Sequence, residues 1–268
     1  MSKKKLQSDG AFIKRNNIGL TKIIGKKVGN KSTKIPARRE LTECLLTDLS
    51  KHFDGKTEVN FSLVKLSTVM NNEHELIQGN IRPPRWKEAN SGIKAICYQK
   101  ALAETNNLVP FTFNLSKKLI SKAAATGNVT DYLRRRIIEH LKSKLKRHVQ
   151  LWFVVEVDHK VTKGRPHIHG SMSISKNEEK TVRHEVFHLI NGKVDAGFKK
   201  VALRFSQRGK YKKGDAGWAT YSTKRIKTSK LLYLDESLLT VDNITRARAK
   251  EIYLNFSDIV LKAQNNVR

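Results

Sequence analysis

The stretch LWFVVEVDHKVTKGRPHIHGSMSIS, residues 151–175, predicts two antiparallel β-strands joined by a polar turn. Its first part, LWFVVEVD, is rich in the β-branched and aromatic side chains that favour strands. A polar segment containing Gly164 follows, and RPHIHGSMSIS then alternates polar and apolar residues, as a half-buried strand does. We therefore expect a β-hairpin here.

The hairpin places a set of metal-ligating side chains on one face. His167 and His169 are two residues apart, so both imidazoles point to the same side of their strand. If the turn spans residues 158–165, Glu156 lies directly opposite His167 on that side, and Asp158 replaces it if the register differs by two. Two imidazoles and one carboxylate with open positions suit Mg²⁺ or Mn²⁺ acting as a Lewis acid on a phosphate oxygen. A lone His-x-His on a strand is commonly structural, so the pair needs support from the rest of the chain.

Helices and strands alternate around the hairpin. PFTFNLS, from Pro110, alternates like a strand, and the apolar stripe of Asp131–His148 indicates a helix. Further on, the patterns indicate a helix at 176–190, a strand at 201–206 and a helix at 217–227. Strands interleaved with helices predict an α/β or α+β fold.

The flanks have a different character. Residues 1–40 hold twelve Lys or Arg against two acids and several glycines, which indicates a flexible basic arm. Residues 41–108 show helical periodicity, and they contain either a DNA-binding helix-turn-helix or a plain helical packing unit. Residues 229–268 return to a helical pattern, clearest from Ile244 to Val260, and form a C-terminal helical extension.

The composition points to nucleic acid. The 53 Lys plus Arg against 24 Asp plus Glu give a formal charge of +29, which a polyanion would neutralise. No apolar run is long enough to span a membrane and the first residues do not resemble a signal peptide, so we expect a cytoplasmic, nucleoid-associated protein. Cys44 and Cys97 stand apart, which excludes a cysteine zinc site and favours buried thiols.

A tyrosine and a lysine follow the hairpin at helical spacing. In YSTK, Tyr221 and Lys224 are three residues apart and so share one side of the helix expected at 217–227. Tyrosine is a weak nucleophile at its usual pKa of about 10, and it needs a nearby cation and a metal-activated phosphate. The YSTK motif alone is weak evidence for a catalytic tyrosine. Lys224 would supply the cation, however, and the expected metal would activate the phosphate.

Together these motifs resemble those of the HUH endonucleases, specifically the rolling-circle replication initiators (Rep proteins) with a single catalytic tyrosine. FTFN (Phe111–Asn114), HIH (His167–His169) and YSTK (Tyr221–Lys224) occur in the order typical of that group. The resemblance covers about residues 109–228 and implies an α+β endonuclease domain with a central antiparallel sheet and flanking helices. It also implies His167, His169 and a nearby acid as metal ligands, Tyr221 as nucleophile and Lys224 as its helper.

The function implied is metal-dependent nicking and joining of single-stranded DNA, at a replication origin or hairpin, through a 5′-phosphotyrosine. Because the chain carries no ATPase helicase domain after the motifs, a host helicase and polymerase are the expected partners. The basic flanks are expected to contact duplex DNA. The residues expected to hold DNA around the site are basic or aromatic: Lys210, Lys212, Lys213, Arg225 and Trp218, with Tyr211 as a second stacking candidate.

Two other interpretations stay open, and a third is set aside. The same chemistry serves mobilisation relaxases and single-strand transposases, and charge alone would suit a non-enzymatic nucleic-acid binder. HEVFH, from His184 to His188, matches the zinc metalloprotease signature with Glu185 as base. We interpret it as coincidental, because Val182 and Val186 mark the core side of that helix and leave both histidines on the other.

Overall fold

The computed structural model describes Leu49 and residues 83–156, 166–191, 203–205, 216–226, 229 and 237–265. All of them belong to the unit Glu40–Arg268, which is distinct in its internal contacts from Met1–Arg39. The expected basic arm and most of residues 41–82, including any helix-turn-helix there, lie outside the described residues. Leu49 is helical and buried.

A five-stranded sheet forms the centre, with the strand order β4-β1-β3-β2-β5. Each pairing between neighbours is antiparallel, so the expected α+β class with a central antiparallel sheet is confirmed. The strands are β1 (Leu108–Asn114), β2 (Leu151–Glu156), β3 (His167–Ser173), β4 (Leu203–Phe205) and β5 (Leu239–Val241).

The β2–β3 pairing has the register that the sequence predicts. Glu156 lies opposite His167 and Val154 lies opposite His169. The turn between the strands, residues 157–165, lies outside the described residues, and with it the alternative ligand Asp158. The hairpin therefore places Glu156 directly opposite His167.

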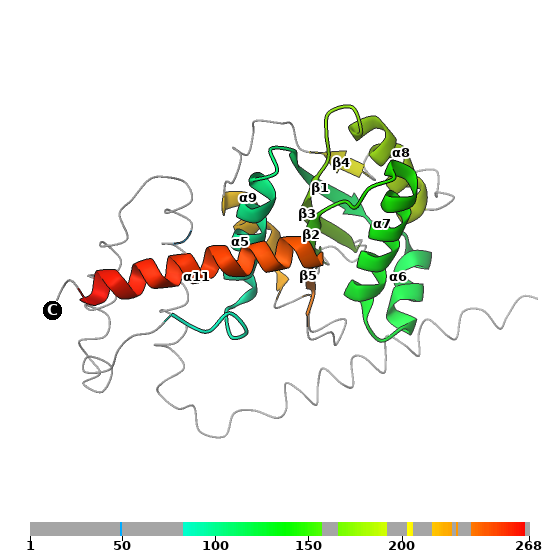
Figure 1. Cartoon of the computed structure of the whole chain (residues 1–268). Coiled ribbons are helices and arrows are strands. Elements are labelled where there is room, and N and C mark those ends of the chain that lie inside the picture. Colours follow the sequence, from blue (N-terminus) through cyan, green and yellow to red (C-terminus); the bar gives the residue numbers. More distant parts are fainter. Residues whose placement is uncertain are drawn as a thin grey trace, which may run out of the picture. The chain divides into compact units, whose positions relative to one another are not determined.

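Three helices cover one face of the sheet (Figure 1). They are α6 (Lys117–Ala125), α7 (Val129–Leu145) and α8 (Glu179–Asn191). The side chains between these helices and the sheet form an apolar cluster that includes Phe111, Phe153, Ile168, Leu141 and Val186. We call this side of the sheet the apolar face. The sequence pattern predicts α7 and α8 but not α6.

Side-chain caps fix where these helices begin. The Asn128 side chain accepts a hydrogen bond from the backbone N–H of Asp131 at 2.9 Å and so starts α7. Before α8, the Glu178 carboxylate accepts from the N–H of Ser175 at 2.8 Å, while the N–H of Glu178 donates to the Ser175 hydroxyl, which is a capping box. Arg147, just after α7, donates to the same Glu178 carboxylate and links the two helices.

The opposite face of the sheet is covered by α5 (Ser91–Ala103), α9 (Ala216–Thr223) and α11 (Asn243–Asn265), as Figure 1 shows. Trp152 and Val154 of β2 belong here to one apolar cluster with Trp218 of α9 and Phe256 of α11. His167, His169 and Glu156 also point to this side, because side chains alternate along β2 and β3. We call it the site face.

The C-terminal region contributes a strand as well as a helix. β5 pairs with β2, although the pattern after residue 229 indicates helix alone. Asp242 lies between β5 and α11 and connects both to β2. Its buried carboxylate accepts hydrogen bonds from the backbone N–H of Leu151 at 2.8 Å and from that of Thr245 at 3.0 Å. The helix expected around Ile244–Val260 is α11, which packs against α5.

The described residues bear on two expectations, that the cysteines are buried thiols and that no segment spans a membrane. Cys97 is a free, buried thiol, as expected, and burial raises its pKa far above the usual range. Cys44 lies outside the described residues. None of the helices in the described part of the chain has the length and apolar character needed to cross a membrane.

Candidate metal centre

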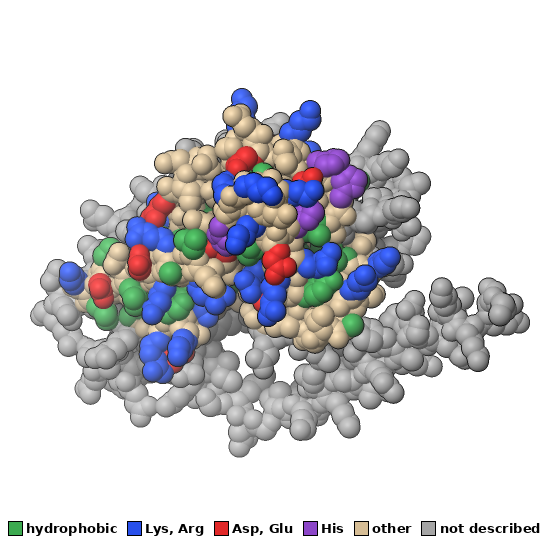
Figure 2. All heavy atoms as spheres, turned by 45° about the vertical axis from the view of Figure 1, so that its right-hand side comes forward, with side chains coloured by type: hydrophobic (Ala, Val, Ile, Leu, Met, Phe, Trp, Pro, Cys, Tyr) green, Lys and Arg blue, Asp and Glu red, His purple; other side chains and the backbone are tan. Residues whose placement is uncertain are grey.

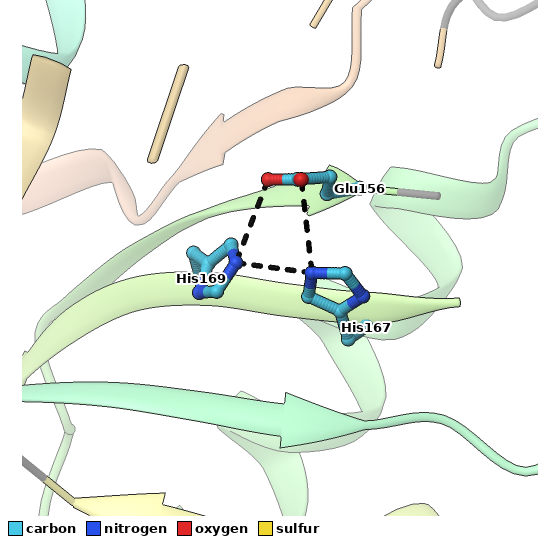
Figure 3. Close-up of side chains that lie close together, drawn as sticks. All are labelled: Glu156, His167 and His169. Carbon is cyan, nitrogen blue, oxygen red and sulfur yellow. Dashed lines mark hydrogen bonds and ion pairs between the residues drawn. The ribbon is translucent and has the colours of Figure 1, made fainter. Parts of the chain in front are cut away.

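Two adjacent strands bring Glu156, His167 and His169 together. β2 ends at Glu156 and β3 begins at His167, so the acid and the first histidine face each other at the open end of the hairpin. His169 follows two residues later on the same side. Figure 3 shows the three side chains pointing toward one another across the strands.

The potential ligand atoms converge. Nε2 of His167 lies 3.0 Å from Nε2 of His169. The Glu156 carboxylate oxygens lie 3.5 Å from Nε2 of His169 and 3.9 Å from Nε2 of His167. Within the residues that the structure describes, this is the group of His, Cys, Asp or Glu side chains arranged to hold a metal ion.

The arrangement fits a divalent cation. Metal–ligand bonds of about 2.1 Å at right angles put neighbouring ligand atoms about 3.0 Å apart, which matches the two Nε2 atoms. Glu156 is 3% exposed, and its Oε2 has no hydrogen-bond partner. A buried carboxylate oxygen without a hydrogen bond is costly, and a bound cation would compensate it. The donor set of two imidazoles and one carboxylate leaves positions for water or a phosphate oxygen.

His169 is held in its neutral form. Burial lowers its pKa to about 3, and the nearby His167 and Lys224 act in the same direction. A neutral imidazole keeps a lone pair on one nitrogen, which is the form that binds a metal.

β1 supports the histidines from the other side of β3. Thr112 lies opposite His169 and Asn114 lies opposite His167 in the β1–β3 register. The Thr112 hydroxyl oxygen is 2.8 Å from Nδ1 of His169, the ring nitrogen that points away from Glu156. The FTFN motif therefore lies directly behind His167 and His169. The sequence does not predict this contact, because a strand pairing between residues 57 positions apart is not encoded locally.

The tyrosine lies beside this group. Tyr221 is on α9, 46% exposed, and its ring centroid is 5.5 Å from that of His169. The Lys224 ammonium lies over the Tyr221 ring, 3.2 Å from its centroid. The structure thus brings the expected nucleophile and its helper next to one of the expected ligands.

Trp218 has a different place from the one expected. It is 3% exposed, stacks on Tyr221 at 5.6 Å between ring centroids, and donates its indole N–H to the Gly170 carbonyl at 2.9 Å. A buried ring offers no free face for a base, so its expected stacking role is replaced by support of Tyr221 and β3. The apolar side of α9 accounts for this burial, because Ala216 and Ala219 are also buried.

The basic residues expected to hold DNA are only partly described. Arg225 follows α9 and its Nε lies 3.7 Å from the Glu156 carboxylate, with about a third of its side chain exposed. Lys210, Lys212, Lys213 and Tyr211 lie outside the described residues. Arg225 is thus the described residue of this set that adjoins the ligand group.

Gly170 was also missed by the sequence analysis, although it directly follows the HIH motif. A Cβ atom there would lie 2.0 Å from the Trp152 carbonyl oxygen, so only glycine fits between the paired strands. The signal was available in principle, because a glycine inside a strand often marks close backbone approach.

The HEVFH motif does not form a comparable group. His184 and His188 are exposed on α8, while Val182 and Val186 are buried. Glu185 pairs with His140, 2.8 Å away, and Lys144, 3.5 Å away. Figure 2, seen from the side of α6–α8, shows histidines at the surface among Lys and Arg. The interpretation of this motif as coincidental agrees with the placement of its residues.

Comparisons of the chain with protein-family models, with curated proteins and with solved structures found no match.

Proposed function

We propose that the chain is an HUH-type, metal-dependent endonuclease that nicks and rejoins single-stranded DNA through Tyr221, and that it initiates rolling-circle replication. The observation that carries the proposal is the position of an exposed tyrosine against the convergent Glu156, His167 and His169. Ligands alone would suit many metal proteins. A tyrosine with a cation over its ring, beside such ligands, is suited to covalent attack on a phosphodiester.

The proposed metal ligands and the proposed nucleophile differ in their exposure to solvent. Glu156 is 3% and His169 5% exposed, whereas Tyr221 is 46% exposed. Burial keeps these two side chains in fixed positions, and the exposed phenol is accessible to a polymer such as single-stranded DNA. The formal charge of +29 supports a polyanionic substrate.

The chemical step exchanges one phosphodiester for another. The Tyr221 oxygen forms a bond to phosphorus as the bond from phosphorus to the 3′ oxygen breaks. The phenol proton passes to solvent, and the departing oxygen takes up a proton to become a 3′-hydroxyl. A later attack by a 3′-hydroxyl on the phosphotyrosine reverses the exchange and joins DNA ends.

The neighbouring residues stabilise the charges of this step. A divalent ion held by Glu156, His167 and His169 would supply Lewis-acid stabilisation of a phosphate oxygen. Lys224, already against the Tyr221 ring, stabilises negative charge as the phenol loses its proton. Arg225, beside the Glu156 carboxylate, is placed to contact a phosphate at the same centre.

The test is formation of a covalent protein–DNA adduct. Labelled single-stranded oligonucleotides, preferably from DNA flanking the gene, are incubated with wild type, Tyr221→Phe and Tyr132→Phe, each with Mn²⁺ or with chelator. Tyr132 is on α7 at the apolar face, so its variant controls for loss of a phenol elsewhere. We expect a Mn²⁺-dependent adduct with wild type and Tyr132→Phe, and none with Tyr221→Phe.

Two results would contradict the proposal. An adduct that persists in Tyr221→Phe would assign the nucleophile elsewhere. Tight, salt-sensitive binding without an adduct across a broad pool of sequences would indicate the non-enzymatic nucleic-acid binder instead. Joining of the cleaved end to a second strand, and replication from a plasmid that carries the cleaved sequence, distinguish a replication initiator from a relaxase or a transposase.

A further inference from the structure

The contact between Thr112 and His169 concerns which ring nitrogen of His169 is free to bind a metal. Thr112 is on β1, directly opposite His169 on β3, and its hydroxyl oxygen lies 2.8 Å from Nδ1. The other ring nitrogen, Nε2, faces His167 and Glu156. The two nitrogens of one imidazole therefore have separate partners on opposite sides.

A neutral imidazole carries one hydrogen, so one nitrogen donates and the other offers a lone pair. For Nε2 to bind a metal, the hydrogen must be on Nδ1, and that nitrogen then needs an acceptor. The His169 side chain is only 7% exposed, which leaves little access for water to serve as that acceptor. The Thr112 hydroxyl oxygen lies at hydrogen-bond distance from Nδ1.

We propose that Thr112 is a positioning residue: it accepts a hydrogen bond from Nδ1 of His169 and thereby fixes Nε2 as the metal-binding nitrogen. The inference rests on the proposed metal centre and assigns a function to the second residue of the FTFN motif. In the opposite arrangement, the hydroxyl donates to Nδ1 and Nε2 carries the hydrogen, which would block ligation. Packing alone does not require a hydroxyl at this strand position, because valine has nearly the same shape.

The experiment compares Thr112→Val, Thr112→Ser and a control, Thr240→Val. Thr240 is a buried strand threonine on β5, opposite Phe153, and so it points to the apolar face. Mn²⁺ binding is followed without DNA by electron paramagnetic resonance of the free ion. The ¹⁵N shifts of His169 in the metal-free wild type report which nitrogen carries the hydrogen. Thermal unfolding without metal checks the fold of each variant.

We expect Thr112→Val to weaken Mn²⁺ binding by about 10- to 100-fold, the usual effect of removing a partner behind a metal ligand. Thr112→Ser should restore most of the affinity, Thr240→Val should leave it unchanged, and His169 should carry its hydrogen on Nδ1. Wild-type affinity in Thr112→Val, or a hydrogen on Nε2, would overturn the inference and leave the metal centre standing. If the wild type itself binds no Mn²⁺, both the metal centre and the inference fail. The ¹⁵N measurement decides the case even if Thr112→Val does not fold.

Discussion

The two faces of the central sheet differ in how completely their polar groups are satisfied. The cluster on the apolar face includes apolar side chains from β1, β2, β3, β4 and helices α6–α8. On the site face, the described residues include three buried side-chain atoms without a hydrogen-bond partner, Gln99 Nε2, Glu156 Oε2 and Ser171 Oγ. Of the three, only the Glu156 atom belongs to a carboxyl group. The difference is that the site face buries a carboxylate oxygen without a hydrogen bond, beside two imidazoles, in a group whose geometry suits a metal ion.

The largest expected effect of the four changes that follow is on stability, from Gly170→Ala. The new methyl group would point to the apolar face and meet the Trp152 carbonyl oxygen at 2.0 Å and the Phe153 Cα at 2.7 Å. Because both are backbone contacts, the strands must separate, and we expect the free energy of unfolding to fall by more than about 4 kcal/mol. Urea denaturation followed by circular dichroism measures this loss.

Gly127→Ala is the matched control for that variant. Gly127 lies between α6 and α7 with a φ of +76°, but no atom lies within 4 Å of a Cβ there. The cost is then only that of a left-handed backbone, about 1–2 kcal/mol. Equal losses in the two glycine variants would show that the sheet does not require close approach at Gly170.

The second variant, Glu156→Gln, is expected to change metal affinity without a comparable change in stability. Glu156→Gln should weaken Mn²⁺ binding by at least the 10- to 100-fold typical of losing a residue behind a ligand, because Glu156 would be a ligand itself. The metal-free variant should differ little in stability from the wild type, because the lower cost of burying an amide offsets the loss of the ion pair with Arg225. Calorimetric titration and thermal unfolding measure the two quantities. Normal Mn²⁺ binding by the variant would contradict the assignment of Glu156 as a metal ligand. Strong destabilisation would contradict the expectation that Glu156 contributes little to the stability of the fold.

A smaller effect is expected on the apolar side, from Glu178→Gln. The hydrogen bonds from Arg147, together with those of Ser175, lower the pKa of Glu178 to about 2. Because this pKa is depressed in the folded state, the carboxylate stabilises the fold above its unfolded pKa of about 4.3 and loses that effect as the pH falls toward 2. After allowance for solvent screening, we expect the variant to lose about 1–2 kcal/mol at pH 7.

Urea denaturation of both proteins between pH 7 and pH 3 tests this dependence. The stability difference should stay constant above about pH 5 and narrow below it. Glu139→Gln, at an exposed position of α7, controls for the exchange of a surface carboxylate for an amide. A difference that widens at acid pH would contradict the assigned role of Glu178, while Mn²⁺ binding at pH 7 should be unaffected.

The smallest effect, close to none, is expected from the double change His184→Ala, His188→Ala. This pair resembles His167 and His169 in ring geometry, with centroids 4.4 Å apart against 4.6 Å. It differs in its surroundings, because both rings are exposed and Glu185 is already paired with His140. Mn²⁺ binding and adduct formation should remain at wild-type levels; a clear loss of either would show that the surface pair takes part.

The sequence predicts the hairpin register and the convergence of Glu156, His167 and His169 because both depend on local spacing. Alternation along a strand determines which side chains share a face, and the length of the turn determines that Glu156 meets His167. The apolar stripe of α7 and the periodicity of α11 are equally local. The coarse α+β class follows from these elements.

The features that the sequence does not predict depend on distant contacts. β5 has three residues, too few for a pattern, and it is joined to β2 by strand pairing and by the Asp242 carboxylate, which accepts a hydrogen bond from the N–H of Leu151. The burial of Trp218 and the Thr112–His169 contact arise only when α9 and β1 are placed against β3. Propensity and periodicity carry no information about such placement.

The most direct test of a metal centre on the site face is anomalous diffraction from crystals soaked in Mn²⁺. The account predicts one strong anomalous peak about 2.1 Å from Nε2 of His167, Nε2 of His169 and an oxygen of Glu156, on the side where Tyr221 lies. A peak at His184 and His188, or no peak between the three ligands at saturating Mn²⁺, would contradict it.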